Sequence, residues 1–178
     1  STFYDCTEML KIDIPSSVNF IGENCFKNCY SLKEITIPSS LTSILKNTFD
    51  SCTSLQKVTF FSNLTSIEGQ AFICCKSLVK LVLPSSLAFI GERCFSMCES
   101  LKEITIPSSV INIQFKAFES CTSLQKVTFS SKTRYINGKV FICCKNLTDL
   151  ILPPSLIFIG DACFNMCQSL QEVTIPSS

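Results

Sequence analysis

The chain has 178 residues, of which 46% are hydrophobic and only 16% are charged, and its net charge is +1. The two signs of charge are interspersed, which disfavours a nucleic acid or a membrane surface held by bulk electrostatics. No run of about eighteen apolar residues is present to span a bilayer. The sequence has no histidine, the commonest general base, and no known catalytic motif, so we expect a protein that is not an enzyme and holds no cofactor or metal.

A 23-residue repeat runs through the whole chain. One Leu in each repeat, from Leu32 and Leu55 to Leu170, follows a Cys by three positions, and Met9 takes its place at the front. Positions are counted below from this residue, so that Ile stands at +12, Phe at +17 and Cys at +20 in every coil. A fixed period of this size predicts a solenoid. We expect one solenoid over 1–178, a fragment of a longer protein, with a partial coil at 1–8, full coils starting at 9, 32, 55, 78, 101, 124 and 147, and a partial coil at 170–178.

Each coil begins with a predicted strand. Apolar residues at +3 and +5 alternate as in a strand with one buried face, and the Pro that most coils carry at +6 ends it, as at 35–37 before Pro38. Apolar residues at +16, +17 and +20 then have helical spacing, which predicts one or two helical turns. Stacked coils would form a parallel sheet of seven or eight strands on one side and short turns on the other.

Larger blocks of three coils also repeat. The segment SLKEITIPSS stands at 31–40 and again, three coils later, at 100–109. Coils of three kinds follow one another in the same order in both blocks, with IGERCFSMC and IGDACFNMC as one matching pair. The chain therefore contains a duplicated unit of three coils.

The repeat pattern LxxIxIPxSVxxIGxxxFxxC, seen here as SLKEITIPSSVINIQFKAFESC, resembles the BspA-like leucine-rich repeat family over essentially the whole chain. The resemblance implies a right-handed, curved leucine-rich repeat solenoid with its parallel β-sheet on the concave face, and with short helical turns and irregular segments on the convex face. It also implies a secreted or cell-surface protein with a role in adhesion. Phe61 and Ser130 in place of Pro, and Thr133 in place of an apolar residue, are local departures.

Two columns of side chains are predicted to form internal ladders. The thirteen cysteines leave three readings open: a reduced buried ladder, which we favour because Cys at +16 alternates with Ala, Thr and Val; disulfides between coils; and, least favoured, zinc. The ladder residues are Phe26, Phe49, Phe72, Phe95, Phe118, Phe141 and Phe164, and Cys29, Cys52, Cys75, Cys98, Cys121, Cys144 and Cys167.

The outward side chains of the predicted sheet are one candidate partner-binding surface. At +2 most neighbours have opposite charge, so the column either complements itself or offers a polar platform to a ligand. The column consists of Lys11, Glu34, Lys57, Lys80, Glu103, Lys126, Asp149 and Glu172.

Aromatic residues at +11 form a second candidate surface. Phe20, Phe89 and Phe158 recur at every third coil, and Tyr135 shares their position. We expect them to fold back over the turns as a satellite core; the alternative is a hydrophobic edge for a partner protein, to which Phe115 would belong.

Three functions remain open. The first is an adhesion module that presents an extended face to a host, matrix or surface protein. The second is a spacer or stalk whose repeat number sets its length. The third is an intracellular interaction scaffold, which free cysteines would favour. Uncapped ends also suggest end-to-end association.

Overall fold

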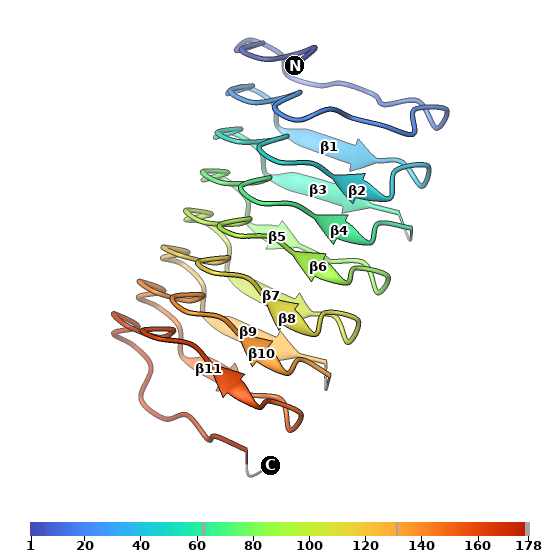
Figure 1. Ribbon diagram of the computed structural model, residues 1–178. Coiled ribbons are helices and arrows are strands. Elements are labelled where there is room, and N and C mark those ends of the chain that lie inside the picture. Colours follow the sequence, from blue (N-terminus) through green and yellow to red (C-terminus); the bar gives the residue numbers. More distant parts are fainter. Residues whose placement is uncertain (62, 131, 177–178) are drawn as a thin grey trace.

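The computed structural model describes residues 1–61, 63–130 and 132–176, so the last two residues of the predicted coil 170–178 lie outside the described chain. The coils stack one on another from the N-terminus to the C-terminus (Figure 1). The predicted leucine-rich repeat solenoid with a parallel sheet is confirmed. The six coils that start between Leu32 and Leu147 each present a strand, a turn, a second short strand and a longer turn in that order, and the first turn contains a Pro in four of them.

The first sheet contains the predicted strands at +2 to +5. Its neighbours pair in parallel with a register shift of one coil, as in Ile35↔Val58 and Ile104↔Val127. The sheet has six strands rather than the seven or eight expected, because none is assigned in the described residues before Glu34 or after Ile159. The strands are β1 Glu34–Ile37, β3 Lys57–Phe60, β5 Lys80–Leu81, β7 Glu103–Ile106, β9 Lys126–Phe129 and β11 Asp149–Ile151.

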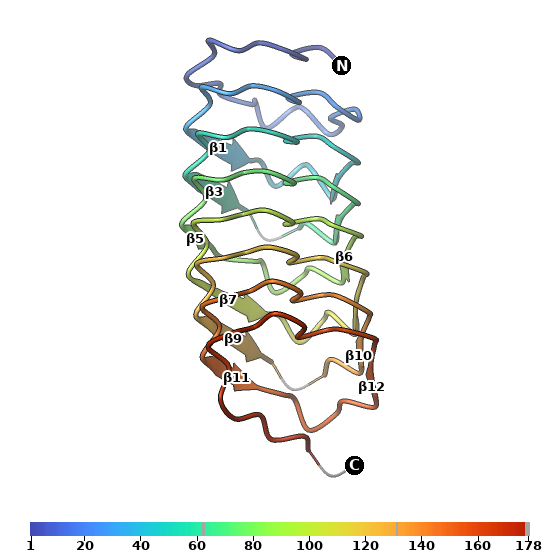
Figure 2. The ribbon, with the colours of Figure 1, turned by 90° about the vertical axis from the view of Figure 1, so that its left-hand side faces the viewer.

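A second parallel sheet of six strands lies on the opposite side of the stack (Figure 2). The sequence did not predict it, because each strand covers only positions +11 and +12, too short for an alternating pattern. The residue at +11 faces outward and the Ile at +12 faces the core. The strands are β2 Ser43–Ile44, β4 Ser66–Ile67, β6 Phe89–Ile90, β8 Asn112–Ile113, β10 Tyr135–Ile136 and β12 Phe158–Ile159.

The longer turn is not helical, which corrects the expected helical turn around AF..C. The described residues contain no helix at all, and therefore none that is long and apolar enough to cross a membrane. The Phe26 N–H donates to the Thr48 carbonyl of the next coil at 2.9 Å instead of to its own turn, so the backbone of this side also links one coil to the next. The left-handed residues that interrupt any helix stand at +15 (Asn24, Asn47, Gln70, Arg93, Lys116, Lys139 and Ala162) and at +19 (Asp5, Asn28, Ser51, Cys74, Met97, Ser120, Cys143 and Met166).

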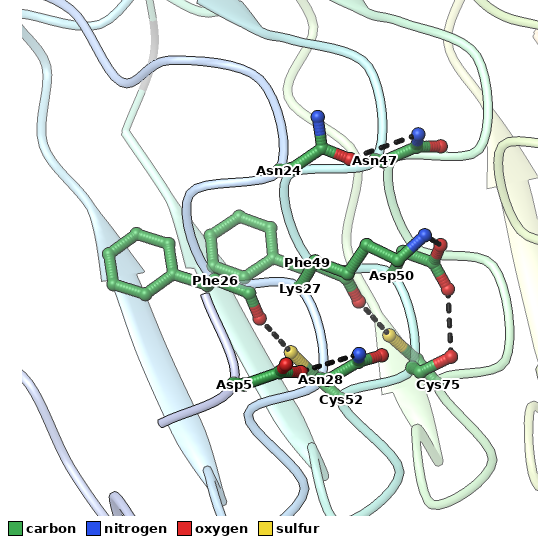
Figure 3. A network of polar contacts seen from close by, with 11 residues as sticks. Asp5, Asn24, Phe26, Lys27, Asn28, Asn47, Phe49, Asp50, Cys52 and Cys75 are labelled. Atoms are coloured by element: carbon green, nitrogen blue, oxygen red, sulfur yellow. Dashed lines mark hydrogen bonds and ion pairs between the residues drawn. The ribbon is translucent and has the colours of Figure 1, made fainter. Parts of the chain in front are cut away.

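The two predicted ladders form the core. Phe rings of successive coils stack with centroids 5.1 to 5.7 Å apart, and Phe95 and Phe118 are 5.4 Å apart. Each ladder thiol donates a hydrogen bond to a Phe carbonyl of the preceding coil, as from Cys52 Sγ to the Phe26 oxygen at 3.2 Å (Figure 3). The predicted buried cysteine ladder is confirmed, and all thirteen cysteines are free thiols in this structure.

Neighbouring coils approach each other closely at two pairs of glycines. A Cβ on Gly91 would collide with the backbone nitrogen of Gly69 in the preceding coil, and one on Gly160 would collide with that of Gly138. Gly22, at the same position of the first coil, meets only a Phe20 ring atom at 3.8 Å. A glycine at +13 is therefore required where the preceding coil carries a glycine at +14, as Gly69 and Gly138 do.

Candidate binding surfaces

The outer face of the first sheet carries the predicted charged column at +2. All its members are exposed except Asp149, which is half-buried. Lys126 pairs with Asp149 at 2.7 Å, and this contact raises the pKa of Lys126 through a hydrogen bond. Two neighbouring pairs of the column carry like charges, Lys57 with Lys80 and Asp149 with Glu172, and Lys57 and Lys80 lie directly opposite each other in the register of β3 and β5.

The same face is hollowed around β5, the shortest strand of its sheet. Two hollows of about 490 and 550 Å³ lie on this face, and both are lined by Lys80 and Val82. Val82 is 66% exposed, in the outward column where most other coils carry Thr. This part of the face therefore differs from a uniformly polar sheet surface.

The aromatic residues at +11 lie on the outer side of the second sheet, except Phe20, which lies before its first strand. Phe20, Phe158 and Tyr135 are 68%, 50% and 37% exposed, so the expected satellite core is wrong for these three. Phe89 is half-buried between Ser66 and Asn112 of the neighbouring strands. For Tyr135 and Phe158 the exposure follows from the second sheet itself, because alternation within a strand turns +11 outward when +12 faces the core.

Phe115 does not join this aromatic column. Its ring lies 5.6 Å from the Lys116 ammonium and 5.9 Å from that of Lys139, both within cation–π range. These contacts place Phe115 in the longer turn, beside Gly138.

Exposed large side chains gather on the C-terminal half of the second sheet. Ile111 and Ile157, both at +10, are 50% and 52% exposed. Arg134 is exposed between them and makes no ion pair within the described chain. Its backbone N–H donates to the Ile111 carbonyl, and its own carbonyl accepts from Ile157, each at 2.9 Å. We call Ile111, Arg134, Ile157, Tyr135 and Phe158 together the C-terminal patch.

The earlier block has small residues at most of the same places. The matching positions three coils before the patch hold Thr42, Thr65, Ser66, Ala88 and Phe89, in the order of Ile111, Arg134, Tyr135, Ile157 and Phe158. The sequence pattern did not single out Ile111, Arg134 and Ile157 as surface residues, because position +10 carries no periodic signal. A comparison of the two blocks position by position would have found them.

A hollow of about 400 Å³ borders the patch. It is lined by Ile111, Arg134 and Lys132, and by three serines, Ser108, Ser109 and Ser155. Two cationic side chains and one aliphatic side chain thus surround an open depression with no acidic residue in its lining.

The cysteine ladder offers no activated nucleophile. Burial raises the pKa of the ladder thiols Cys29 and Cys167, and of the neighbouring Cys163, to about 11, and raises those of Cys75 and Cys98 well above the ordinary value of a thiol. A thiol that keeps its proton at neutral pH is a poor nucleophile. Within the described residues, no three Cys, Asp or Glu side chains form a metal cluster.

The repeats match a known family. BspA-type leucine-rich repeat regions, in six copies, match residues 1–102 and 70–178. The chain belongs to this family. No curated protein matches this BspA-type chain in sequence, but solved structures of leucine-rich repeat proteins do match it.

Three bacterial structures illustrate the similarity of this BspA-type chain, each at 32% sequence identity. A leucine-rich repeat protein of T. pallidum has a TM-score of 0.85, with 89% of this chain and 77% of that protein covered. One from Bacteroides ovatus has a TM-score of 0.79, with coverage of 88% and 40%. A leucine-rich cell surface protein of Faecalibacterium prausnitzii has a TM-score of 0.78, with coverage of 86% and 42%. The chain spans less than half the length of the last two.

Proposed function

We propose that this chain is a non-enzymatic protein-binding module of a cell-surface protein, and that the C-terminal patch holds the partner. The observation that carries the proposal is the difference between the two blocks. Most of their core positions hold the same residue types, with Leu64 and Thr133 as the clearest exception, whereas the outer face of the second sheet changes from Thr, Ser and Ala to Ile, Arg and Tyr. A surface used only as a spacer has no reason to acquire exposed apolar side chains, which carry a risk of aggregation.

The composition of the patch supports a protein as its ligand. Tyr and Arg are enriched among the residues that contribute most to protein–protein binding. Arg134 and Lys132 border a hollow without an acidic residue, so the partner should supply a carboxylate there. Ile111 and Ile157 flank Arg134 and would exclude water from that ion pair, which strengthens it.

The similarity to family members supports a location at the cell surface. One of the similar structures is a cell surface protein, and by analogy the partner would be a host, matrix or surface protein. Analogy between relatives is weaker support than the patch itself.

The outer face of the first sheet is a second candidate surface. Its support is the exposed Val82 beside the like-charged pair Lys57 and Lys80, between two hollows. Lys11, Glu34, Glu103, Lys126, Asp149 and Glu172 would surround a ligand bound there.

Substitutions copied from the earlier block test the proposal. A variant with Ile111→Thr, Arg134→Thr, Tyr135→Ser and Ile157→Ala should keep its unfolding midpoint, because the fold already accommodates these residues at the matching positions. We would compare the binding of both proteins to host cells and to a panel of purified matrix proteins. Binding should weaken by at least about tenfold, as expected for the loss of one or two strongly contributing residues.

A matched control changes the other face. Lys57→Thr with Lys80→Thr should leave binding unchanged if the C-terminal patch is the binding site, and should weaken it if the first sheet is. Equal binding by all variants would contradict both surfaces and favour the spacer. Free thiols at all thirteen cysteines in protein taken from its native source, found inside the cell, would favour an intracellular scaffold.

A further inference from the structure

The left-handed positions at +19 hold an unexpected set of residues. Left-handed backbone suits short polar side chains, and Asp5, Asn28, Ser51 and Ser120 follow this rule. The exceptions are all sulfur-containing: Cys74, Met97, Cys143 and Met166, with φ of 60 to 62°.

These four residues form two pairs across neighbouring coils. The distance from Sγ to Sδ is 3.6 Å both in Cys74–Met97 and in Cys143–Met166. Both thiols are half-buried, and Met97 and Met166 are 40% and 52% exposed. The sulfur atoms are therefore accessible from solvent, unlike those of the buried ladder.

The fold does not need sulfur at these places. The first pair of coils has Asp5 and Asn28 there, and the Asn28 amide donates to the Asp5 carboxylate at 2.6 Å (Figure 3). A hydrogen-bonded pair of polar side chains is thus accommodated on the same left-handed backbone at +19. The backbone at this position therefore does not require sulfur.

Each block contains one sulfur pair. Cys74 and Met97 correspond to Cys143 and Met166. The residues around the methionines differ, with Arg93, Ser96 and Glu99 replaced by Ala162, Asn165 and Gln168, whereas FICCK around Cys74 recurs unchanged around Cys143.

We propose that each Cys–Met pair binds one monovalent soft metal ion, Cu(I), with the thiolate and the thioether as ligands. Thiolate and thioether sulfur select Cu(I) over the hard cations, which prefer oxygen. With metal–sulfur bonds of about 2.3 Å, sulfur atoms at this separation give a bent angle of roughly 100°, which leaves room for a further small ligand from solvent.

Binding releases one proton from each thiol to solvent, and the oxidation state of copper does not change.

The test is an anaerobic titration of the reduced protein with Cu(I), in competition with the chromophoric chelator bicinchoninate. The native chain should hold two copper ions that compete with the chelator. A variant with Cys74→Asp and Met97→Asn, which copies the polar pair of the first coils, should hold one. The quadruple variant with Cys143→Asp and Met166→Asn as well should hold none.

Two further measurements separate this site from the buried ladder. Met97→Leu keeps the size of the side chain and removes only the thioether, so it should lower the affinity of one site by about tenfold or more. Unfolding midpoints show whether each variant remains folded. A native chain that holds no copper, or a folded quadruple variant that holds as much as the native chain, would overturn the proposal.

Discussion

The block of residues 32–100 and the block of residues 101–169 have similar cores, but they differ on the outer face of the second sheet. Phe72 and Phe141 are both fully buried, and each meets a second Phe edge-on, at 6.3 and 6.5 Å. On the second sheet, by contrast, Ser66 in the first block becomes Tyr135 in the second. Stacking restricts the identity of core residues, because each core side chain must pack against its counterparts in the coils above and below. Surface residues face solvent and are not restricted in this way.

The largest expected loss of folding stability comes from a rise in pH, which should affect the cores of both blocks. The folded state raises the pKa of buried thiols above their ordinary 9.0, as at Cys52 and Cys121. The unfolded chain therefore ionises first, so stability is complete below pH 9 and is lost as the pH rises through the folded pKa, about 11 for Cys29. Each such thiol costs up to about 1.4 kcal/mol per pH unit in that window, several kcal/mol together.

Urea unfolding at pH 8, 9 and 10 under reducing conditions measures this loss. Cys98→Ala removes one fully buried thiol, so its stability should fall less steeply with pH. A native chain equally stable at pH 8 and pH 10 would show that these thiols do not remain protonated on folding.

Truncation of the Phe ladder tests whether the cores are equivalent. Phe72→Ala and Phe141→Ala should each cost about 3–5 kcal/mol, the usual range for a buried Phe, because both rings have the same burial and similar neighbours. Chemical denaturation measures the cost. A difference above about 1 kcal/mol between the two would indicate that the blocks are not energetically equivalent.

Substitution of the closely packed glycines should give the next largest loss of stability. Gly91→Ala in the first block and Gly160→Ala in the second should each cost about 1–3 kcal/mol, because the new methyl group forces neighbouring backbones apart. Gly22→Ala is the control, and its effect should stay within about 0.5 kcal/mol, since its Cβ meets no backbone. Thermal unfolding of the three variants checks this order, and a Gly22→Ala loss equal to the others would refute the steric explanation.

The smallest effect should come from exchange of the differing surfaces. Tyr135→Ser and Ser66→Tyr should each change stability by no more than about 0.5 kcal/mol, as for ordinary surface substitutions. The first should also weaken partner binding, and the second should not. If Tyr135→Ser lowered the unfolding midpoint by several degrees, Tyr135 would be a structural residue rather than part of a binding surface.

The candidate surfaces were only partly predictable. The charged column at +2 followed from the alternation in the first strand, and the structure exposes it as expected, with Asp149 half-buried. Phe20, Tyr135 and Phe158 were identified as residues of interest but were expected to be covered. Ile111, Arg134 and Ile157 were missed, because single hydrophobic or basic residues in a turn-rich segment carry no periodic signal.

The sequence by itself determined the period, the ladders and the family, because a side chain that stacks on its own copy must recur at a fixed interval. It did not determine the second sheet, since two-residue strands such as Ser43–Ile44 exist only through hydrogen bonds to neighbouring coils. It also suggested a helix where the tertiary structure places left-handed turns. There the Phe26 N–H bonds to the next coil, and hydrogen bonding between coils replaces the local bonds that a helix requires.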